Sequence, residues 1–264
     1  MLTAAPAPPI LTVMDTKTWP LHELTLKVLD LSAQIAYYQA FGFHLDVQSE
    51  NQAVLSAGKG ARITLKKLAN GRPRPPKTAG LFHFALLLPD RASLGAFVRF
   101  AARNSFHFVG AADHLVSESL YFSDDEGNGI EVYADRPRTQ WQWKGHTVRM
   151  ATIALDLEEL ERLPGADWAG FPSGTRLGHM HLTVGDLNRS QQFYESLGLQ
   201  LTLDWGSFRF LSWNGYHHHL AINLLEGRGA APITPETAGL ESFSIRHHSL
   251  EKETMDPAGI RLVL

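Results

Sequence analysis

Two stretches of the sequence, one in each half, repeat each other and decide the fold. Residues 24–45 read LTLKVLDLSAQIAYYQAFGFHL, and residues 180–201 read MHLTVGDLNRSQQFYESLGLQL. Aligned at a constant offset they share an aspartate, a tyrosine and a glycine, namely Asp30 with Asp186, Tyr38 with Tyr194, and Gly42 with Gly198. Self-similarity of this kind indicates that one supersecondary unit occurs more than once in the chain.

The repeated unit begins with a strand and continues with a helix. Residues 24–28 alternate between apolar and polar side chains, which is a strand pattern. Asp30 can cap a helix, apolar residues then recur at i, i+4 and i+7 from Leu31, and Gly42 stands where a left-handed residue ends a helix. The short runs FHLDVQ, QAVLS and ARITLKKL follow as further strands. The unit is therefore predicted to be a βαβββ module.

A second pair of similar stretches raises the number of modules to four. TAGLFHFAL (78–86) matches TAGLESFSI (237–245). The fourth module has only about ten residues where the second has a helix and strands, so we expect that it has lost its helix and two strands. We expect an α+β protein with four segments: an N-terminal lead-in (1–19), a first domain (20–140, modules 20–75 and 78–135), a linker (141–174) and a second domain (175–264, modules 175–230 and 237–264, the last one truncated).

The composition favours a globular protein that acts on a small molecule. Hydrophobic residues make up 44% and charged residues 19% of the chain, and the net charge of −3 gives no reason to expect a nucleic acid or an anionic membrane as partner. The absence of cysteine excludes disulfides and thiolate metal sites. The N-terminus lacks a signal pattern and no stretch reaches the roughly 18 apolar residues of a membrane span, so we expect a cytoplasmic location. The 13 histidines are candidate metal ligands.

Four further stretches carry a resemblance to a known family: LFHFALLLPDR (81–91), DHLVSESLYFSDDEGNGIEVYADRPRTQW (113–141), LGHMHLTVGDL (177–187) and GYHHHLAINLLEGRGAAP (215–232). Together with the four modules, they resemble the catechol 2,3-dioxygenase-like branch of the vicinal oxygen chelate superfamily. The resemblance covers nearly the whole chain except the shortened fourth module. It implies the vicinal oxygen chelate fold, with two curved mixed sheets and one divalent metal in a cup.

The resemblance also implies which residues bind the metal. In this superfamily the ligands come from the first strand of each paired module and from the last strand of one, which implies His83, Glu131 and His179. Two histidines and one carboxylate form the facial triad of Fe(II) oxygenases, and Mn(II) can fill the same set. The corresponding positions of the first and fourth modules are Glu23, Ser242 and Val263. Because those three are a poor metal set, we expect the second and third modules to share the cup.

Each of these residues also has a purely structural interpretation. His83 lies in an apolar strand, on the face to which alternation also assigns Leu81, and a lone histidine there is usually a core residue. Glu131 fits a solvated edge strand, whereas in a buried strand a metal would stabilise it. His179 and His181 share a strand face; the distance to the family aspartate selects His179, but a shift of one pleat repeat would select His181.

The histidine run 217–219 is the candidate for acid/base chemistry. In ring-cleaving relatives the acid/base histidine lies three residues before a strand alanine, which is His218 before Ala221 in this chain. A histidine suits proton transfer because its pKa lies near neutrality. Strand alternation predicts that His217 and His219 turn to the opposite face. The alternative is that the run is a surface accident.

Two further residues are candidates for contacts with the substrate. Tyr121 lies ten residues before Glu131, a spacing similar to that of a family tyrosine that hydrogen-bonds substrate or bound oxygen. The alternative for Tyr121 is a core aromatic residue. His114 precedes Tyr121 by seven residues and is a further candidate donor, although it departs from the family position by about two residues.

The resemblance therefore implies an Fe(II)-dependent extradiol dioxygenase that opens a catechol-like aromatic diol with O2. Its expected partners are a small aromatic substrate and O2, without nucleic acid or membrane, and a homo-oligomer stays open. One alternative is a glyoxalase-like isomerase or lyase that uses Ni, Zn or Mn with ligands such as Glu23, His83 and Glu131. Another is a non-catalytic drug- or metabolite-binding protein of the bleomycin-resistance type, which needs no convergent ligands.

Overall fold

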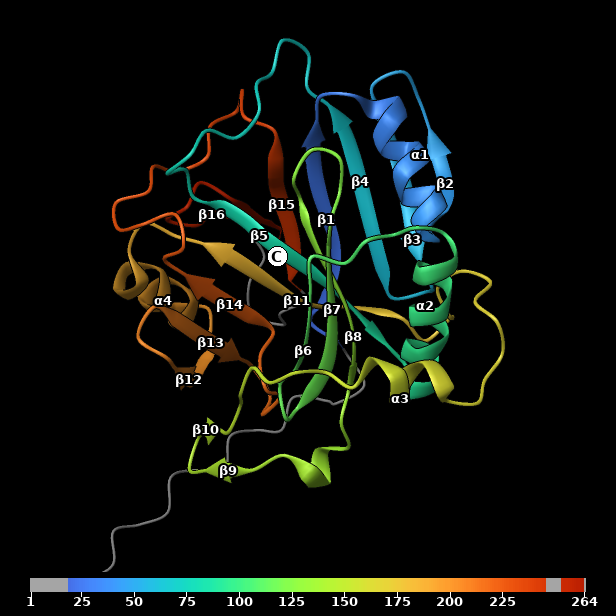
Figure 1. Ribbon diagram of the computed structural model, residues 1–264. Coiled ribbons are helices and arrows are strands. Elements are labelled where there is room, and N and C mark those ends of the chain that lie inside the picture. The colour runs from blue at the N-terminus through green and yellow to red at the C-terminus, as the bar shows by residue number, and fades with distance from the viewer. Residues whose placement is uncertain (1–18, 246–252, 264) are drawn as a thin grey trace, which may run out of the picture.

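The computed structural model describes residues 19–245 and 253–263. The expected lead-in (1–19) therefore lies outside the described residues except for Trp19. The described chain forms two large, curved mixed sheets accompanied by few helices (Figure 1). The expected α+β class is confirmed.

The larger sheet combines the second and third modules. Its strands occur in the order β12 (Gln200–Asp204), β13 (Phe208–Ser212), β14 (Leu220–Asn223), β11 (Arg176–Thr183), β5 (Gly80–Leu88), β8 (Gly129–Asp135), β7 (Ser117–Ser123) and β6 (Gly110–Asp113). The two modules meet where β11 and β5 pair in antiparallel fashion. The expectation that these two modules share one sheet is confirmed.

The smaller sheet combines the first and fourth modules. Its strands occur in the order β16 (Thr254–Met255), β17 (Arg261–Val263), β15 (Gly239–Ile245), β1 (Leu21–Val28), β4 (Ala61–Lys67), β3 (Gln52–Ala57) and β2 (His44–Gln48). The fourth module was expected to keep two of its four strands, but it supplies three described strands, β15, β16 and β17. Its residues 246–252 lie outside the described ranges. Each sheet therefore draws strands from both halves of the chain.

The three longer helices all begin at an aspartate. They are α1 (Leu31–Phe41), α2 (Arg91–Arg103) and α4 (Leu187–Ser196). The side chains of Asp30, Asp90 and Asp186 accept hydrogen bonds from backbone N–H groups of the first turn, which would otherwise lack partners. Gly42 ends α1 with a φ of 113°, in the left-handed region that disfavours a side chain.

The repeated tyrosine ties each helix of an odd-numbered module to the module that follows. The hydroxyl of Tyr38 donates to Oδ2 of Asp124 at 2.9 Å, and the hydroxyl of Tyr194 donates to Oδ2 of Asp256 at 2.7 Å. All four side chains are buried, and each aspartate also accepts backbone N–H bonds from its own turn. These bonds satisfy carboxylates whose burial would otherwise be costly. The internal repeat therefore includes the buried polar contacts between modules.

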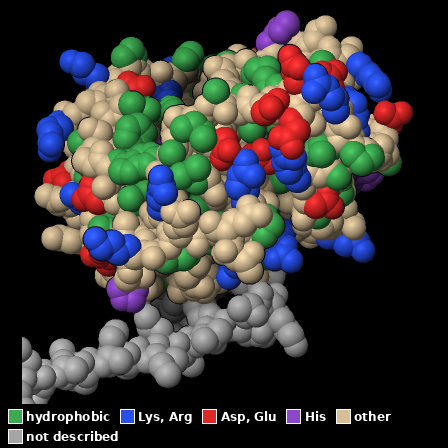
Figure 2. Space-filling model, turned by 60° about the horizontal axis from the view of Figure 1, so that its bottom comes forward, with side chains coloured by type: hydrophobic (Ala, Val, Ile, Leu, Met, Phe, Trp, Pro, Cys, Tyr) green, Lys and Arg blue, Asp and Glu red, His purple; other side chains and the backbone are tan. Residues whose placement is uncertain are grey.

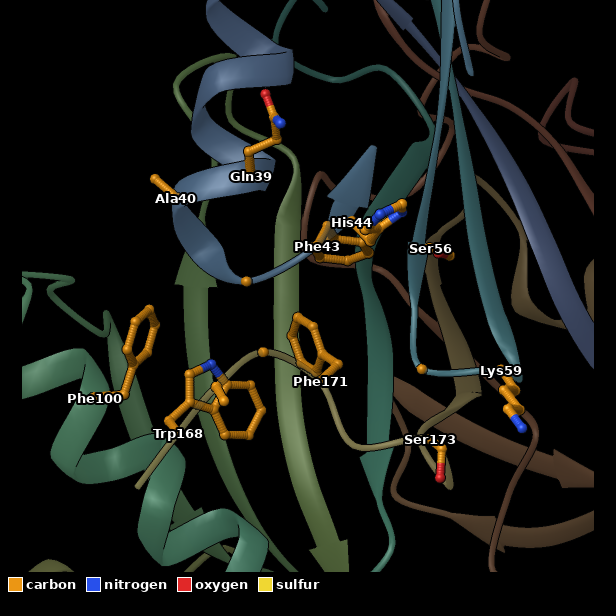
Figure 3. A pocket seen from close by; sticks show the side chains of 14 residues that line it. Gln39, Ala40, Phe43, His44, Ser56, Lys59, Phe100, Trp168, Phe171 and Ser173 are labelled. Carbon is orange, nitrogen blue, oxygen red and sulfur yellow. The ribbon is translucent and has the colours of Figure 1, made fainter. Parts of the chain in front are cut away.

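The expected linker (141–174) packs against the rest of the molecule. It follows η1 (Arg138–Gln140) and contains β9 (Trp143–Lys144), β10 (Thr147–Val148) and α3 (Leu157–Arg162). Its far end returns to the first module, where the ring centroids of Phe171 and Phe43 are 5.0 Å apart and Trp168 lies against Gly42. A cavity of about 640 Å³ opens between this segment and the end of α1 (Figure 3). The described residues that line it hold no cluster of metal ligands.

None of the helices described is long and apolar enough to cross a bilayer. Figure 2 shows one face, on which hydrophobic side chains gather on one side while acidic and basic side chains lie intermingled on the other.

Candidate metal centre

Two β-bulges shape the surface on which the candidate ligands lie. In the pairing of β5 with β11, Gly178 is an extra residue on β11 and Phe82 is an extra residue on β5. Because a bulge interrupts the alternation of side chains, Leu81 enters the core while both Phe82 and His83 line the cavity. The expectation that Leu81 shares the face of His83 is therefore wrong.

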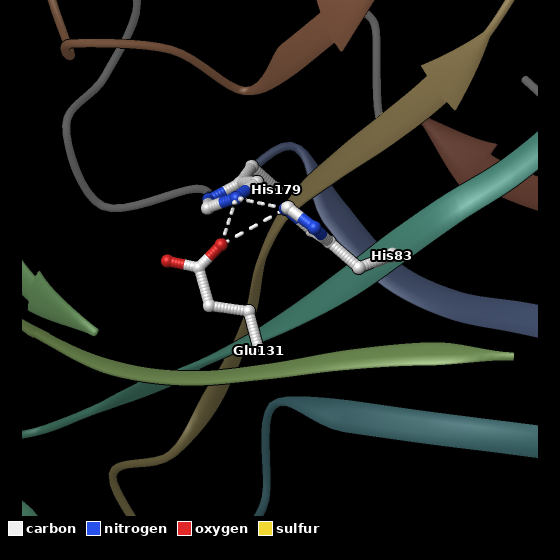
Figure 4. A group of neighbouring side chains, drawn as sticks. All are labelled: His83, Glu131 and His179. Atoms are coloured by element: carbon white, nitrogen blue, oxygen red, sulfur yellow. Dashed lines mark hydrogen bonds and ion pairs between the residues drawn. The ribbon is translucent and has the colours of Figure 1, made fainter. Parts of the chain in front are cut away.

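Three buried side chains converge on three adjacent strands of the larger sheet: His83 on β5, Glu131 on β8 and His179 on β11 (Figure 4). Oε2 of Glu131 is 2.9 Å from Nε2 of His83 and 3.0 Å from Nε2 of His179. The two Nε2 atoms are 3.3 Å apart. Within the described ranges, no other group of three or more candidate ligands lies so close together. We refer to these three residues as the ligand group.

The separations within the ligand group fit a divalent metal. Ligand bonds of about 2.1 Å at right angles hold their donor atoms about 3.0 Å apart, and the observed separations are 2.9, 3.0 and 3.3 Å. Two imidazoles and one carboxylate on the same side of an ion leave its remaining coordination positions free for other molecules.

Glu131 and His179 have the charge states that a metal requires of its ligands. Burial raises the pKa of Glu131, but His179 and His83 outweigh it, so that the pKa lies well below its usual value. Burial lowers the pKa of His179, although Glu131 opposes this effect. Near pH 7, Glu131 is therefore ionised and His179 is neutral. Metal ions bind carboxylates and neutral imidazoles in these states.

The histidine run lies in an irregular bend that precedes β14, not in a strand. His218 lines the cavity, and its ring centroid is 4.2 Å from that of His179. Nδ1 of His217 lies 2.7 Å from Nδ1 of His218. Of the three histidines, only His218 lines the cavity, although strand alternation is not the reason because the run lies in a bend. His219 packs among aromatic rings and does not line the cavity.

Tyr121 and His114 lie near the ligand group and are hydrogen-bonded to each other. Tyr121 on β7 pairs with Glu131 on β8, and its ring centroid is 5.5 Å from that of His83. Nδ1 of His114 donates to the carbonyl of Ala151 at 2.7 Å, which leaves Nε2 to accept from the hydroxyl of Tyr121 at 2.6 Å. Burial raises the pKa of Tyr121 well above its usual value, so this side chain is a neutral phenol.

His181 lines the same cavity in a defined tautomer and is not part of the ligand group. Oδ1 of Asn223 accepts the backbone N–H of Leu225 at 2.9 Å, so the amide nitrogen of Asn223 faces Nε2 of His181 at 2.9 Å and donates to it. Burial lowers the pKa of His181 well below its usual value. The imidazole is therefore neutral and carries its proton on Nδ1.

A cavity of about 660 Å³ opens onto the ligand group. Much of its wall is apolar, including Phe82, Val109, Met150, Trp205, Phe208 and Phe210. Met150 and Thr152 belong to the expected linker, and the sequence contains no motif there that would place them at the site. An aromatic wall of this kind can accommodate flat apolar molecules, and polar side chains such as those of the ligand group can fix their orientation.

The smaller sheet carries no comparable ligand group among its described residues. Glu23 on β1 accepts a hydrogen bond from Oγ1 of Thr64 at 3.1 Å. Its expected partners Ser242 and Val263 lie on β15 and β17 of the same sheet. Glu23 does not join the ligands of the larger sheet, because β1 belongs to the other sheet.

Comparison with known proteins gives sequence and fold relationships that agree with this geometry. The model of the glyoxalase/bleomycin resistance protein/dioxygenase superfamily matches residues 21–132 and 176–262. A catechol-2,3-dioxygenase of Bacillus subtilis (strain 168) is 38% identical over 231 residues, which cover 84% of this chain and 80% of that protein.

Two solved structures show a similar fold at low sequence identity. A glyoxalase I variant from Zea mays matches with a TM-score of 0.54 and 16% identity, covering 92% of each chain. The cppA protein of Streptococcus pneumoniae matches with a TM-score of 0.56 and 10% identity, covering 93% of this chain and 98% of that one. At such identities the likeness concerns the fold alone.

Proposed function

Because the chain belongs to the glyoxalase/bleomycin resistance protein/dioxygenase superfamily, we propose that it is an Fe(II)-dependent extradiol dioxygenase that opens a catechol-like aromatic diol with O2. The observation that carries the proposal is the convergence of His83, Glu131 and His179 on one point at the cavity. The similarity to a protein named catechol-2,3-dioxygenase supports the choice of reaction.

The ligand group would hold the Fe(II) through Nε2 of His83, Nε2 of His179 and Oε2 of Glu131. When bound, the ion supplies Lewis acidity and one-electron redox chemistry. The chain itself binds and orients the substrate. Phe82, Phe208 and Phe210 line the cavity, and we expect them to hold the aromatic ring and exclude water around it.

Two groups of the cavity wall would handle protons and hydrogen bonds. Burial lowers the pKa of His218 well below its usual value, so its ring is neutral near pH 7 and can accept a proton from a diol hydroxyl. Tyr121 is a neutral phenol bonded to His114. Its hydroxyl would act as a hydrogen-bonding group beside the substrate, with His114 as the residue that orients it.

The two alternative functions have less support from the described residues. A carboxylate-rich site that includes Glu23 is not assembled, because Glu23 lies in the smaller sheet. A metal-free binding protein has no need for three buried ligands within hydrogen-bond distance of one another.

The test is oxygen uptake by the Fe(II)-loaded protein. The protein is loaded anaerobically, its iron content is measured, and O2 consumption is followed with catechol and with alkyl- and aryl-substituted catechols. We expect consumption of one O2 per diol and incorporation of both atoms of ¹⁸O2 into a ring-opened product. Iron bound at one per chain without O2 uptake from any of these diols would contradict the proposal.

Variants of the ligand group separate loss of metal from loss of fold. His83→Ala and Glu131→Gln should bind Fe(II) at least about 10-fold more weakly and lose activity. Arg103→Ala is a matched control, because Arg103 forms an exposed ion pair with Asp167 at 3.2 Å and neither residue lines the cavity; this variant should retain both iron and activity.

A further inference from the structure

Behind His218, on the side away from the cavity, lies a chain of hydrogen-bonded polar side chains. Nδ1 of His218 is 2.7 Å from Nδ1 of His217, and Nε2 of His217 is 3.0 Å from Oδ1 of Asp135. The same Oδ1 accepts a hydrogen bond from the hydroxyl of Tyr216 at 3.0 Å. His217 is 0% exposed, while Asp135 is partly exposed at the end of β8.

The carboxylate at the end of this chain determines where each proton lies. A carboxylate only accepts hydrogen bonds, so Nε2 of His217 must carry the proton that it donates to Asp135. With His217 as a neutral imidazole, its Nδ1 has a lone pair, and Nδ1 of His218 donates to it. In this arrangement His218 carries its proton on Nδ1, which leaves a lone pair on its Nε2.

Aromatic rings hold this arrangement in place. The ring centroid of His217 is 3.9 Å from that of Tyr216 and 5.0 Å from that of Trp141. In such close packing the imidazole has little room to rotate. His218 itself lines the cavity, and because its Nδ1 is bonded to His217, Nε2 is the nitrogen that remains available to a ligand.

We propose that Asp135 and His217 are positioning residues that hold His218 in the tautomer whose Nε2 lone pair serves the cavity. This inference rests on the proposed function, since the proton that Nε2 would accept is that of the catechol-like diol. Neither positioning residue lines the cavity, so both act through His218. A second residue that fixes the tautomer and orientation of an imidazole is a common requirement when that imidazole acts as a base.

Kinetics of the Fe(II)-loaded protein test the effect on the reaction. His217→Phe replaces the imidazole by an aromatic ring without nitrogen atoms. In this variant we expect kcat to fall by about 10–100-fold while KM changes by less than about 3-fold. His217→Asn retains a side-chain oxygen that can accept from Nδ1 of His218, and it should recover most of the loss. Asp135→Ala should lower kcat by a smaller factor, because His217 then populates both tautomers.

A spectroscopic measurement tests the same inference without activity. The measurement is NMR of the full-length metal-free chain labelled with ¹⁵N-histidine. The signals of His218 are those that disappear in His218→Gln. In the wild type they should have the pattern of the Nδ1–H tautomer. In His217→Phe they should move toward a mixture of tautomers. If His217→Phe does not fold, Asp135→Ala carries both measurements.

The outcomes separate this inference from the proposed function. A wild-type protein that cleaves no catechol contradicts the proposed function, whereas the NMR pattern still decides the tautomer of His218. An Nε2–H pattern in the wild type would overturn the positioning role. So would a kcat in iron-bound His217→Phe equal to that of the wild type.

Discussion

Gly178 precedes His179 and lies against the ring of Tyr133, so one added methyl group at this position tests that packing directly. A Cβ at Gly178 would lie 2.1 Å from the hydroxyl oxygen of Tyr133 and 2.6 Å from its Cε1, whereas 3.4–4 Å is an ordinary van der Waals contact. The ring of Tyr133 must therefore move by roughly 1 Å. Tyr133 is 0% exposed and its hydroxyl is 2.8 Å from that of Tyr216, so this movement breaks a buried hydrogen bond.

Gly178→Ala should accordingly cost several kcal/mol in the free energy of unfolding. Overpacking contributes about 1–3 kcal/mol, and the buried hydroxyls left without a partner contribute about 1–3 kcal/mol. With a urea m-value of about 2–3 kcal/mol/M, the midpoint of unfolding falls by about 0.7–3 M. Because the ring centroids of Tyr133 and His179 are 5.1 Å apart, the variant should also bind less Fe(II).

The assay is urea unfolding followed by tryptophan fluorescence, together with iron content per chain. Gly165→Ala is the matched control, since a Cβ there would find its nearest atoms on Ala92 and Arg99 at 3.8 and 3.9 Å. It should change the free energy of unfolding by less than about 0.5 kcal/mol. The reasoning fails if Gly178→Ala unfolds at the same urea concentration as the control and binds as much iron.

Three further predictions concern the second sheet, the module contacts and pH. Glu23→Gln should leave the Fe(II) content unchanged, measured by metal analysis, because Glu23 lies outside the ligand group; loss of iron would favour the isomerase alternative. Tyr194→Phe should lower the free energy of unfolding by about 1–3 kcal/mol, measured by urea unfolding, because buried Asp256 loses a donor. Burial lowers the pKa of His181 and His219 well below 6.5, so below that pH the unfolded chain binds protons that the folded chain excludes. The melting temperature of the metal-free protein should therefore fall as the pH falls from 7.5 to 5.5, and an unchanged or rising value would contradict the burial of these neutral rings.

Much of the fold follows from local patterns that the sequence displays. The helix starts at Asp30 and Asp186 and the helix end at Gly42 depend on interactions within a few residues, and such interactions recur wherever the same pattern recurs. The internal repeat indicated four modules, and the poor ligand set at Glu23 indicated which modules pair. The three residues of the ligand group, implied by the resemblance, do lie together in the structure.

What the sequence alone determined is therefore the module, its repetition and the types of side chain available for a metal. The tertiary structure decided which face each side chain occupies. The bulges at Phe82 and Gly178 depend on the register between two strands far apart in the chain, and a register of this kind is set by pairing that no local pattern encodes. The hydrogen bonds from His218 through His217 to Asp135 join segments 82 residues apart. They arise because a bend replaces the strand that alternation assumed and because the packing of the two modules brings β8 beside it.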